Sequence, residues 1–131
     1  MTREIKYCSE CGKLYAETHH IVFRSEAKAL EHCKLNLVNL CIEHHKGTFG
    51  PHGSKGSAAN KKYKLEFQNK LEILLDKQFL TKEEINKVLQ ISDKALNRLL
   101  KTLSLQNGLY VREDVIRVCM GGKLVIEEGA E

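Results

Sequence analysis

The sequence lacks an apolar run long enough to cross a membrane, and it also lacks a secretory signal peptide. A membrane-spanning helix needs about 20 consecutive apolar residues. Met1 is followed by Thr-Arg-Glu-Ile-Lys, which has no apolar core of the kind that a signal peptide carries. These absences predict a cytoplasmic protein without a membrane partner. The chain has no internal repeat either, and 131 residues suffice for one modest domain or two very small ones.

The cysteines cannot all be paired in disulfides within the chain. The chain has five cysteines, an odd number, and cysteines in the cytoplasm stay reduced. We therefore interpret them as metal ligands plus spare core residues rather than as disulfides.

Acidic residues are absent between His44 and Leu65, where Gly and Ser accompany five lysines: Lys46, Lys55, Lys61, Lys62 and Lys64. This composition predicts a basic loop or linker, and the net charge of +4 favours a polyanionic partner. Beyond it, apolar residues follow helical spacing, beginning with Phe67, Leu71, Leu74, Leu75 and Phe79. We place a boundary near residue 60, which divides the chain into domains 1–60 and 61–131.

The first third of the chain has two ligand pairs with the spacing of a zinc site. Cys8 and Cys11 form a C-x2-C pair followed by Gly12, and Cys41 and His44 form a C-x2-H pair about thirty residues later. Two such pairs can converge on one tetrahedral Zn²⁺, and three cysteines with one histidine are a common structural set. Cys33 competes as a fourth ligand, but it has no partner at this spacing. The alternative is that these are ordinary small core residues.

His45 directly follows the last predicted zinc ligand. If residues 41–47 begin a helix, Cys41 and His44 share a face and His45 is turned by about 100° from His44. His45 then faces a second site. His19 and His20, which precede an apolar run, are candidates for that site.

The order C-x2-C, H-H-I, N-x4-C-x2-H-H resembles the His-Asn-His (HNH) endonucleases of the ββα-metal type, especially the small zinc-stapled versions of phages and mobile elements. The resemblance covers residues 8 to about 53. It implies an α+β fold with a zinc-stapled ββα-metal module. By this pattern His20 resembles the general base, while His19 and His45 resemble ligands of a catalytic divalent cation. Asn36, preferred over Asn39 by its distance to His45, resembles the residue that braces the hairpin and orients the base.

The chain departs from the family pattern in two places. The second zinc pair ends in His44, where cysteine is commoner, and a third protein ligand for the catalytic cation is not evident. His52 could supply it, but we expect His52 to be a loop histidine that touches solvent or phosphate.

The predicted chemistry is hydrolysis of a phosphodiester bond. A neutral histidine can accept a proton from the attacking water. A divalent cation can neutralise the phosphate and the departing oxygen. Two imidazoles do not select one metal strongly, so we expect Mg²⁺ or Mn²⁺, with Co²⁺ or Ni²⁺ also active.

The second half of the chain is expected to be a small, mainly α-helical module. Thr81-Lys-Glu-Glu84 is a capping box, and Ser92 can cap the next helix after a short turn. This arrangement resembles a helix-turn-helix that positions DNA, with an outward face of Lys94, Asn97, Arg98 and Lys101. A strand and a helix capped by Gly121 would follow. Packing or dimerisation of the helical hairpin is the alternative.

The sequence therefore predicts a metal-dependent HNH endonuclease that acts on DNA. A non-catalytic zinc-finger DNA-binding protein and an RNA-directed nuclease stay open as alternatives. The choice between monomer and homodimer also stays open, as do the target site and the type of cut.

Overall fold

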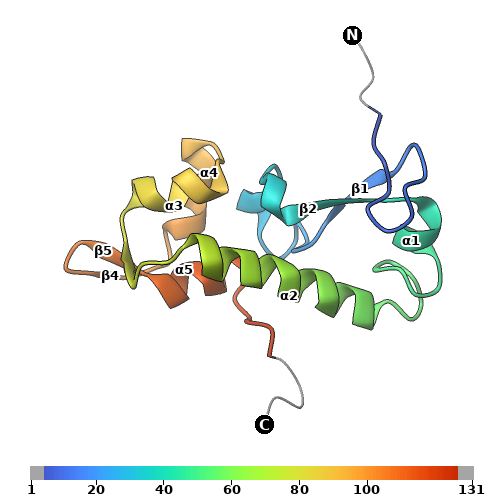
Figure 1. Cartoon of the computed structure of the whole chain (residues 1–131). Coiled ribbons are helices and arrows are strands. Elements are labelled where there is room, and N and C mark those ends of the chain that lie inside the picture. Colours follow the sequence, from blue (N-terminus) through green and yellow to red (C-terminus); the bar gives the residue numbers. More distant parts are fainter. Residues whose placement is uncertain (1–4, 127–131) are drawn as a thin grey trace.

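The computed structural model describes residues 5–126. In this range the fold is a mixture of α and β structure, with two small antiparallel sheets and five α-helices. The first sheet and the short helix after it lie at one end of the molecule, and the last three helices lie at the other (Figure 1). Helix α2, Ser57–Leu74, runs along the molecule between the two ends. None of the helices within residues 5–126 is both long and apolar enough to span a membrane.

The first sheet pairs β1, Glu17–His20, with β2, Leu37–Leu40. Glu17 lies opposite Leu40, and His20 lies opposite Leu37. The connection between the strands contains two 3₁₀ turns, η1 (Lys28–Leu30) and η2 (Lys34–Asn36). Helix α1, Ile42–Lys46, follows β2 directly and contacts both strands. Alternation along a strand puts Glu17 and His19 on one face of β1.

The helix expected after the basic loop begins earlier than predicted. The loop ends at Gly56, so the predicted boundary near residue 60 lies inside the first turns of α2. Phe67 and Leu71 are buried on this helix as predicted. Leu74 is 48% exposed, and Phe79 lies outside α2, in strand β3 (Phe79–Leu80). Phe79 pairs with Val111 of the second sheet, so strand pairing and not helical spacing sets its position.

The turn signals of the second half are confirmed. Helix α3, Lys82–Leu89, begins with a capping box in which Thr81 and Glu84 bond each other's backbone N–H. Helix α4, Asp93–Leu100, is capped by the side chain of Ser92. The chain then forms β4 (Leu105–Gln106), β5 (Leu109–Val111) and α5 (Arg112–Cys119). After α5, Gly121 has a φ of +76°, the left-handed conformation predicted for a capping glycine.

A shared core joins the two halves. Buried residues of the first sheet region, of α2 and of α3 to α5 belong to one apolar cluster. Helix α4 contacts η1, and the buried Cys33 thiol lies 3.4 Å from the Leu89 carbonyl oxygen. Cys119 is buried in the same core, as expected of an ordinary apolar residue.

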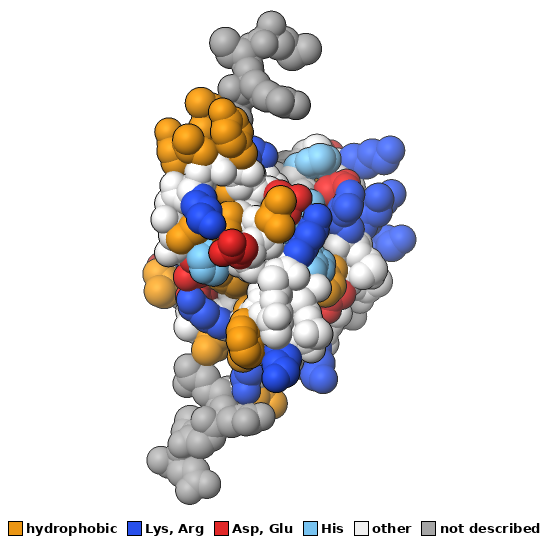
Figure 2. Space-filling view, turned by 90° about the vertical axis from the view of Figure 1, so that its right-hand side faces the viewer, with side chains coloured by type: hydrophobic (Ala, Val, Ile, Leu, Met, Phe, Trp, Pro, Cys, Tyr) orange, Lys and Arg blue, Asp and Glu red, His pale blue; other side chains and the backbone are white. Residues whose placement is uncertain are grey.

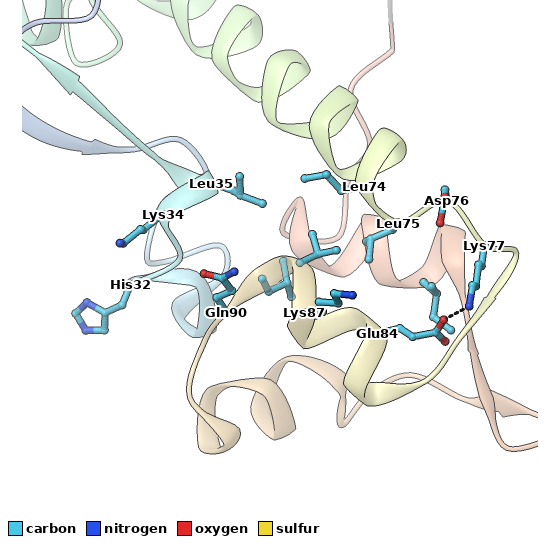
Figure 3. A pocket seen from close by; sticks show the side chains of 13 residues that line it. His32, Lys34, Leu35, Leu74, Leu75, Asp76, Lys77, Glu84, Lys87 and Gln90 are labelled. Atoms are coloured by element: carbon cyan, nitrogen blue, oxygen red, sulfur yellow. Dashed lines mark hydrogen bonds and ion pairs between the residues drawn. The ribbon is translucent and has the colours of Figure 1, made fainter.

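A groove of about 670 Å³ lies where η2, the end of α2 and α3 meet (Figure 3). Its apolar wall includes Leu35, Leu74 and Val88. An ion pair between Lys77 and Glu84 spans one end.

Candidate metal centres

The four predicted zinc ligands come together at the start of α1. Cys8 and Cys11 lie in a tight turn in which the Gly12 N–H donates to the Cys8 carbonyl oxygen at 2.8 Å. Gly12 has a φ of +78°, which favours glycine at this position. Cys41 is the N-cap of α1, and its sulfur accepts from the His44 N–H at 3.5 Å. Helical spacing then brings His44 back over Cys41.

The distances in this Cys-His cluster fit a tetrahedral zinc ion. The Cys11 and Cys41 sulfurs are 3.7 Å apart, and His44 Nδ1 lies 3.2 Å from Cys41 Sγ and 3.6 Å from Cys8 Sγ. With Zn–S bonds of about 2.3 Å and Zn–N bonds of about 2.0 Å, a tetrahedron has S···S edges of about 3.8 Å and S···N edges of about 3.5 Å. The cluster could therefore hold a metal ion such as zinc.

The backbone around the cluster favours the thiolate form of Cys8. Burial alone raises the pKa of this thiol, but hydrogen bonds from the backbone of Cys41, Cys11 and Glu10 lower it to about 6. A thiolate is the form that binds metal. The Cys33 thiol lies outside the cluster, and burial raises its pKa.

A second cluster contains three histidines. Ligand nitrogens of His19, His45 and His52 all lie within 4.8 Å of one another. His19 Nδ1 and His45 Nε2 are 3.2 Å apart, and both side chains are buried. Metal–nitrogen bonds of about 2.1 Å place neighbouring ligand nitrogens about 3.0 Å apart in an octahedron and about 3.4 Å apart in a tetrahedron. The His19–His45 pair therefore has the spacing of two ligands of one metal, and the three histidines form a group that could hold an ion.

His52 is the member of this cluster that the sequence did not lead us to expect. The loop 47–56 folds back over α1, and the His52 N–H donates to the His45 carbonyl oxygen at 2.9 Å. Gly53 makes the return possible, because a Cβ there would lie 1.7 Å from the Gly47 carbonyl oxygen. Glycines at positions 47, 50, 53 and 56 are the signal in the sequence for this compact loop.

His19 is held in its neutral form. Burial is the main reason, and the nearby His45, His52 and His20 add to it, so that the pKa of His19 falls to about 4. Its Nε2 atom is buried and has no hydrogen-bond partner among the described residues. A neutral, buried imidazole beside two others is suited to a cation, since metal ligation needs the unprotonated nitrogen.

Glu17 is a second residue that sequence reasoning missed. One of its carboxylate oxygens lies 2.9 Å from His45 Nδ1, and the other lies 3.3 Å from Lys46 Nζ. These contacts, with that of His45 first, lower the pKa of Glu17. The sequence signal is the E-x-H spacing on β1, which places Glu17 on the same face as His19.

His20 lies beside the three-histidine cluster without belonging to it. Its Nε2 is 2.9 Å from the Glu31 carbonyl oxygen. A carbonyl only accepts, so in the neutral ring Nε2 carries the proton and Nδ1 keeps its lone pair. His20 and the three clustered histidines line one cavity of about 230 Å³, together with Thr18, Phe23 and Arg24. Strand β1 ends at His20, which allows neighbouring residues to reach the same cavity.

Asn36 is fully buried and holds the segment that His20 contacts. Its side chain accepts from the Val22 N–H at 2.7 Å and donates to the carbonyl oxygens of Val22 at 3.0 Å and Leu30 at 3.3 Å. Asn39, in contrast, makes a longer side-chain contact of 3.4 Å with Thr18. Asn36 thus ties the end of β1 to the turn that carries the Glu31 carbonyl.

Histidine side chains reach the surface at the end of the molecule that carries α1, with lysine and arginine side chains around them (Figure 2). The four residues singled out on α4 and just after it are also exposed: Lys94, Asn97, Arg98 and Lys101. Asn97 is engaged with Lys82 and Asp93.

The chain matches no protein-family model, no curated protein and no solved structure.

Proposed function

We propose that this protein is a metal-dependent HNH endonuclease that hydrolyses phosphodiester bonds in DNA. The observation that carries the proposal is the pairing of two different clusters on one five-residue helix. His44 belongs to the Cys-His cluster, and His45 belongs to the three-histidine cluster beside His20. The order β1, β2, α1 supports a ββα-metal module held by zinc.

In this proposal His20 is the general base. Its Nε2–H donates to the Glu31 carbonyl, so the Nδ1 lone pair is available to take a proton from water. Asn36 fixes the turn that carries this carbonyl, which makes Asn36 a positioning residue. A base placed this way is oriented before the substrate arrives.

His19, His45 and His52 would hold the catalytic cation. When bound, Mg²⁺ or Mn²⁺ supplies charge that stabilises the scissile phosphate and the departing oxygen. The low pKa of His19 keeps this ligand neutral over the physiological range. Arg24 lines the same cavity, but its guanidinium is paired with Glu31 at 3.2 Å.

The second half supports a role in positioning DNA. Helices α3 and α4 are joined by a short turn, and α4 exposes basic side chains, as in a helix-turn-helix. Because α2 and the shared core connect the halves, we propose that this region contributes affinity and that the three-histidine cluster contributes the chemistry.

The test is cleavage of supercoiled plasmid by the zinc-loaded protein with Mg²⁺ or Mn²⁺. We expect nicked or linear product from the parent and from His32→Ala, a matched control because His32 is an exposed histidine outside both clusters. His20→Ala and His45→Ala should lose the activity. Equal activity in all four proteins, or none in the parent, would contradict the proposal.

Parallel reactions with single-stranded and duplex RNA separate an RNA-directed nuclease from a DNA nuclease. DNA binding without cleavage by the zinc-loaded parent, in every metal tried, would instead support a non-catalytic zinc-finger protein.

A further inference from the structure

The carboxylate of Glu17 contacts one ring nitrogen of His45, and His19 contacts the other. His45 Nδ1 is 2.9 Å from Glu17, and His45 Nε2 is 3.2 Å from His19 Nδ1. An ionised carboxylate only accepts hydrogen bonds. The proton of a neutral His45 ring therefore lies on Nδ1, and the lone pair of Nε2 points into the three-histidine cluster.

From this geometry we infer that Glu17 is a positioning residue, which fixes the tautomer and the orientation of His45 so that Nε2 is available to a divalent cation. The inference rests on the cation site of the proposed function. Metal-bound histidines commonly donate their other ring N–H to a carboxylate, which orients the ring and makes it a better ligand.

The fold holds Glu17 itself in place. Glu17 lies opposite Leu40 in the sheet. Leu40 directly precedes Cys41, the N-cap of α1. Its second oxygen is 3.3 Å from Lys46 Nζ, on the residue after His45. Each carboxylate oxygen thus has its own partner on α1, and the carboxylate cannot turn without losing one of them.

The backbone of His45 and the ring of His45 are held by different contacts around α1. The Cys-His cluster holds the start of the helix through Cys41, and the His45 N–H donates to the Cys41 carbonyl oxygen at 2.8 Å. Those contacts set the backbone of His45 but do not by themselves choose which ring nitrogen faces His19. The contact with Glu17 sets the ring.

The first measurement is the tautomer of His45, read from the ring nitrogen shifts in NMR spectra of zinc-loaded protein without a second metal. We expect the parent to be protonated at Nδ1, and Glu17→Ala to lose this preference. A parent ring protonated at Nε2 would overturn the inference without involving cleavage.

The second measurement is the Kd for Mn²⁺, titrated by EPR on zinc-loaded protein. Glu17→Ala should weaken binding by about 10- to 100-fold, the usual effect of losing such a partner. Glu17→Gln keeps an acceptor without the charge and should fall between. Glu43→Ala is the matched control, because it also removes one carboxylate near the site. The exposed side chain of Glu43, on α1, pairs with Lys13 and not with a histidine.

Zinc content and thermal midpoint should stay at the parent values in all three variants. If Glu17→Ala binds Mn²⁺ as tightly as Glu43→Ala does, the inferred role of Glu17 is wrong. The proposed cation site is not contradicted by that result. If the parent binds Mn²⁺ no better than His45→Ala, the cation site of the proposed function fails, and the role of Glu17 fails with it.

Discussion

His44 and His45 are neighbours in the chain, yet their side chains belong to different clusters. The reason is the helix that contains both residues, since consecutive positions on a helix are turned by about 100°. His44 is exposed and lies over Cys41, whereas His45 is buried against Glu17 and His19. The same substitution at the two positions should therefore have two different effects.

His44→Ala should lose zinc and lower the thermal midpoint by about 10 °C or more, because a ligand of the structural metal is gone. His45→Ala should keep zinc and a midpoint within a few degrees of the parent, while cleavage collapses. His20→Ala should behave like His45→Ala, with a rate loss of about 10² to 10⁴.

Zinc content, thermal unfolding and plasmid cleavage are measured side by side for each protein. Zinc loss in His45→Ala but not in His44→Ala would mean that the two assignments are exchanged.

At the scale of elements, α3 begins with an arrangement that responds to pH. The ion pair with Lys77, and then the N–H of Thr81, lower the pKa of Glu84 from 4.5 to about 2. A carboxyl group whose pKa is lower in the folded state stabilises the fold above its unfolded pKa and loses that effect as the pH falls.

The Glu84→Gln variant should thus be less stable than the parent by a constant amount from pH 8 to 5. The difference should shrink as the pH falls from 4.5 toward 2. Urea unfolding at each pH measures the difference in the free energy of unfolding between the two proteins. Glu83→Gln is the control, because Glu83 is an exposed neighbour in the same first turn. A difference that grows on acidification would contradict the assignment of this pair.

Helix α4 is the element that we expect to meet DNA. Neutralising Lys94, Arg98 and Lys101 together should weaken DNA binding and lower the slope of log K against log salt by about one for each side chain that contacts phosphate. Binding at several salt concentrations measures this slope. A control with Lys34, Lys70 and Lys123 neutralised removes the same charge from exposed positions outside α4. Equal effects in the two triple variants would make α4 a packing or dimer element.

At the scale of the whole molecule, the first sheet region is small and packs on the shared core, and we expect it to need zinc as well. Its connection to the other half includes the Cys33–Leu89 contact and the packing of α4 on η1. A metal ligated only in the folded state adds its binding free energy to folding.

Removing zinc, by a chelator or by Cys11→Ser, should unfold residues 1–60 first. Cys11 is exposed, so its substitution removes a ligand without opening the core. Hydrogen exchange should show lost protection in β1, β2 and α1 before α3 to α5. Unchanged protection in the metal-free protein would show that zinc is not needed for this fold.

Short sequence patterns were enough to predict many local features of this structure. The two ligand pairs, the capping box at Thr81, the cap at Ser92 and the glycine after α5 are short-range features, and each lies where it was predicted. Their geometry depends on a few neighbouring residues, which a sequence displays directly. The position of Phe79 was wrong because helical spacing alone does not reveal where strand pairing takes over. The start of α2 was wrong because the Gly- and Ser-containing composition of the basic loop extends into residues that form the first turn of the helix.

The sequence by itself indicated the four residues of the Cys-His cluster and the caps of α3 and α4. Only the tertiary structure decided that His52 joins His19 and His45, that Glu17 contacts His45, and that one core spans both halves. The physical reason is distance along the chain. His19 and His45 are 26 positions apart, and Glu17 and His45 are 28 apart. Whether such residues meet depends on the register of β1 with β2 and on the loop after α1, which no short stretch of sequence contains.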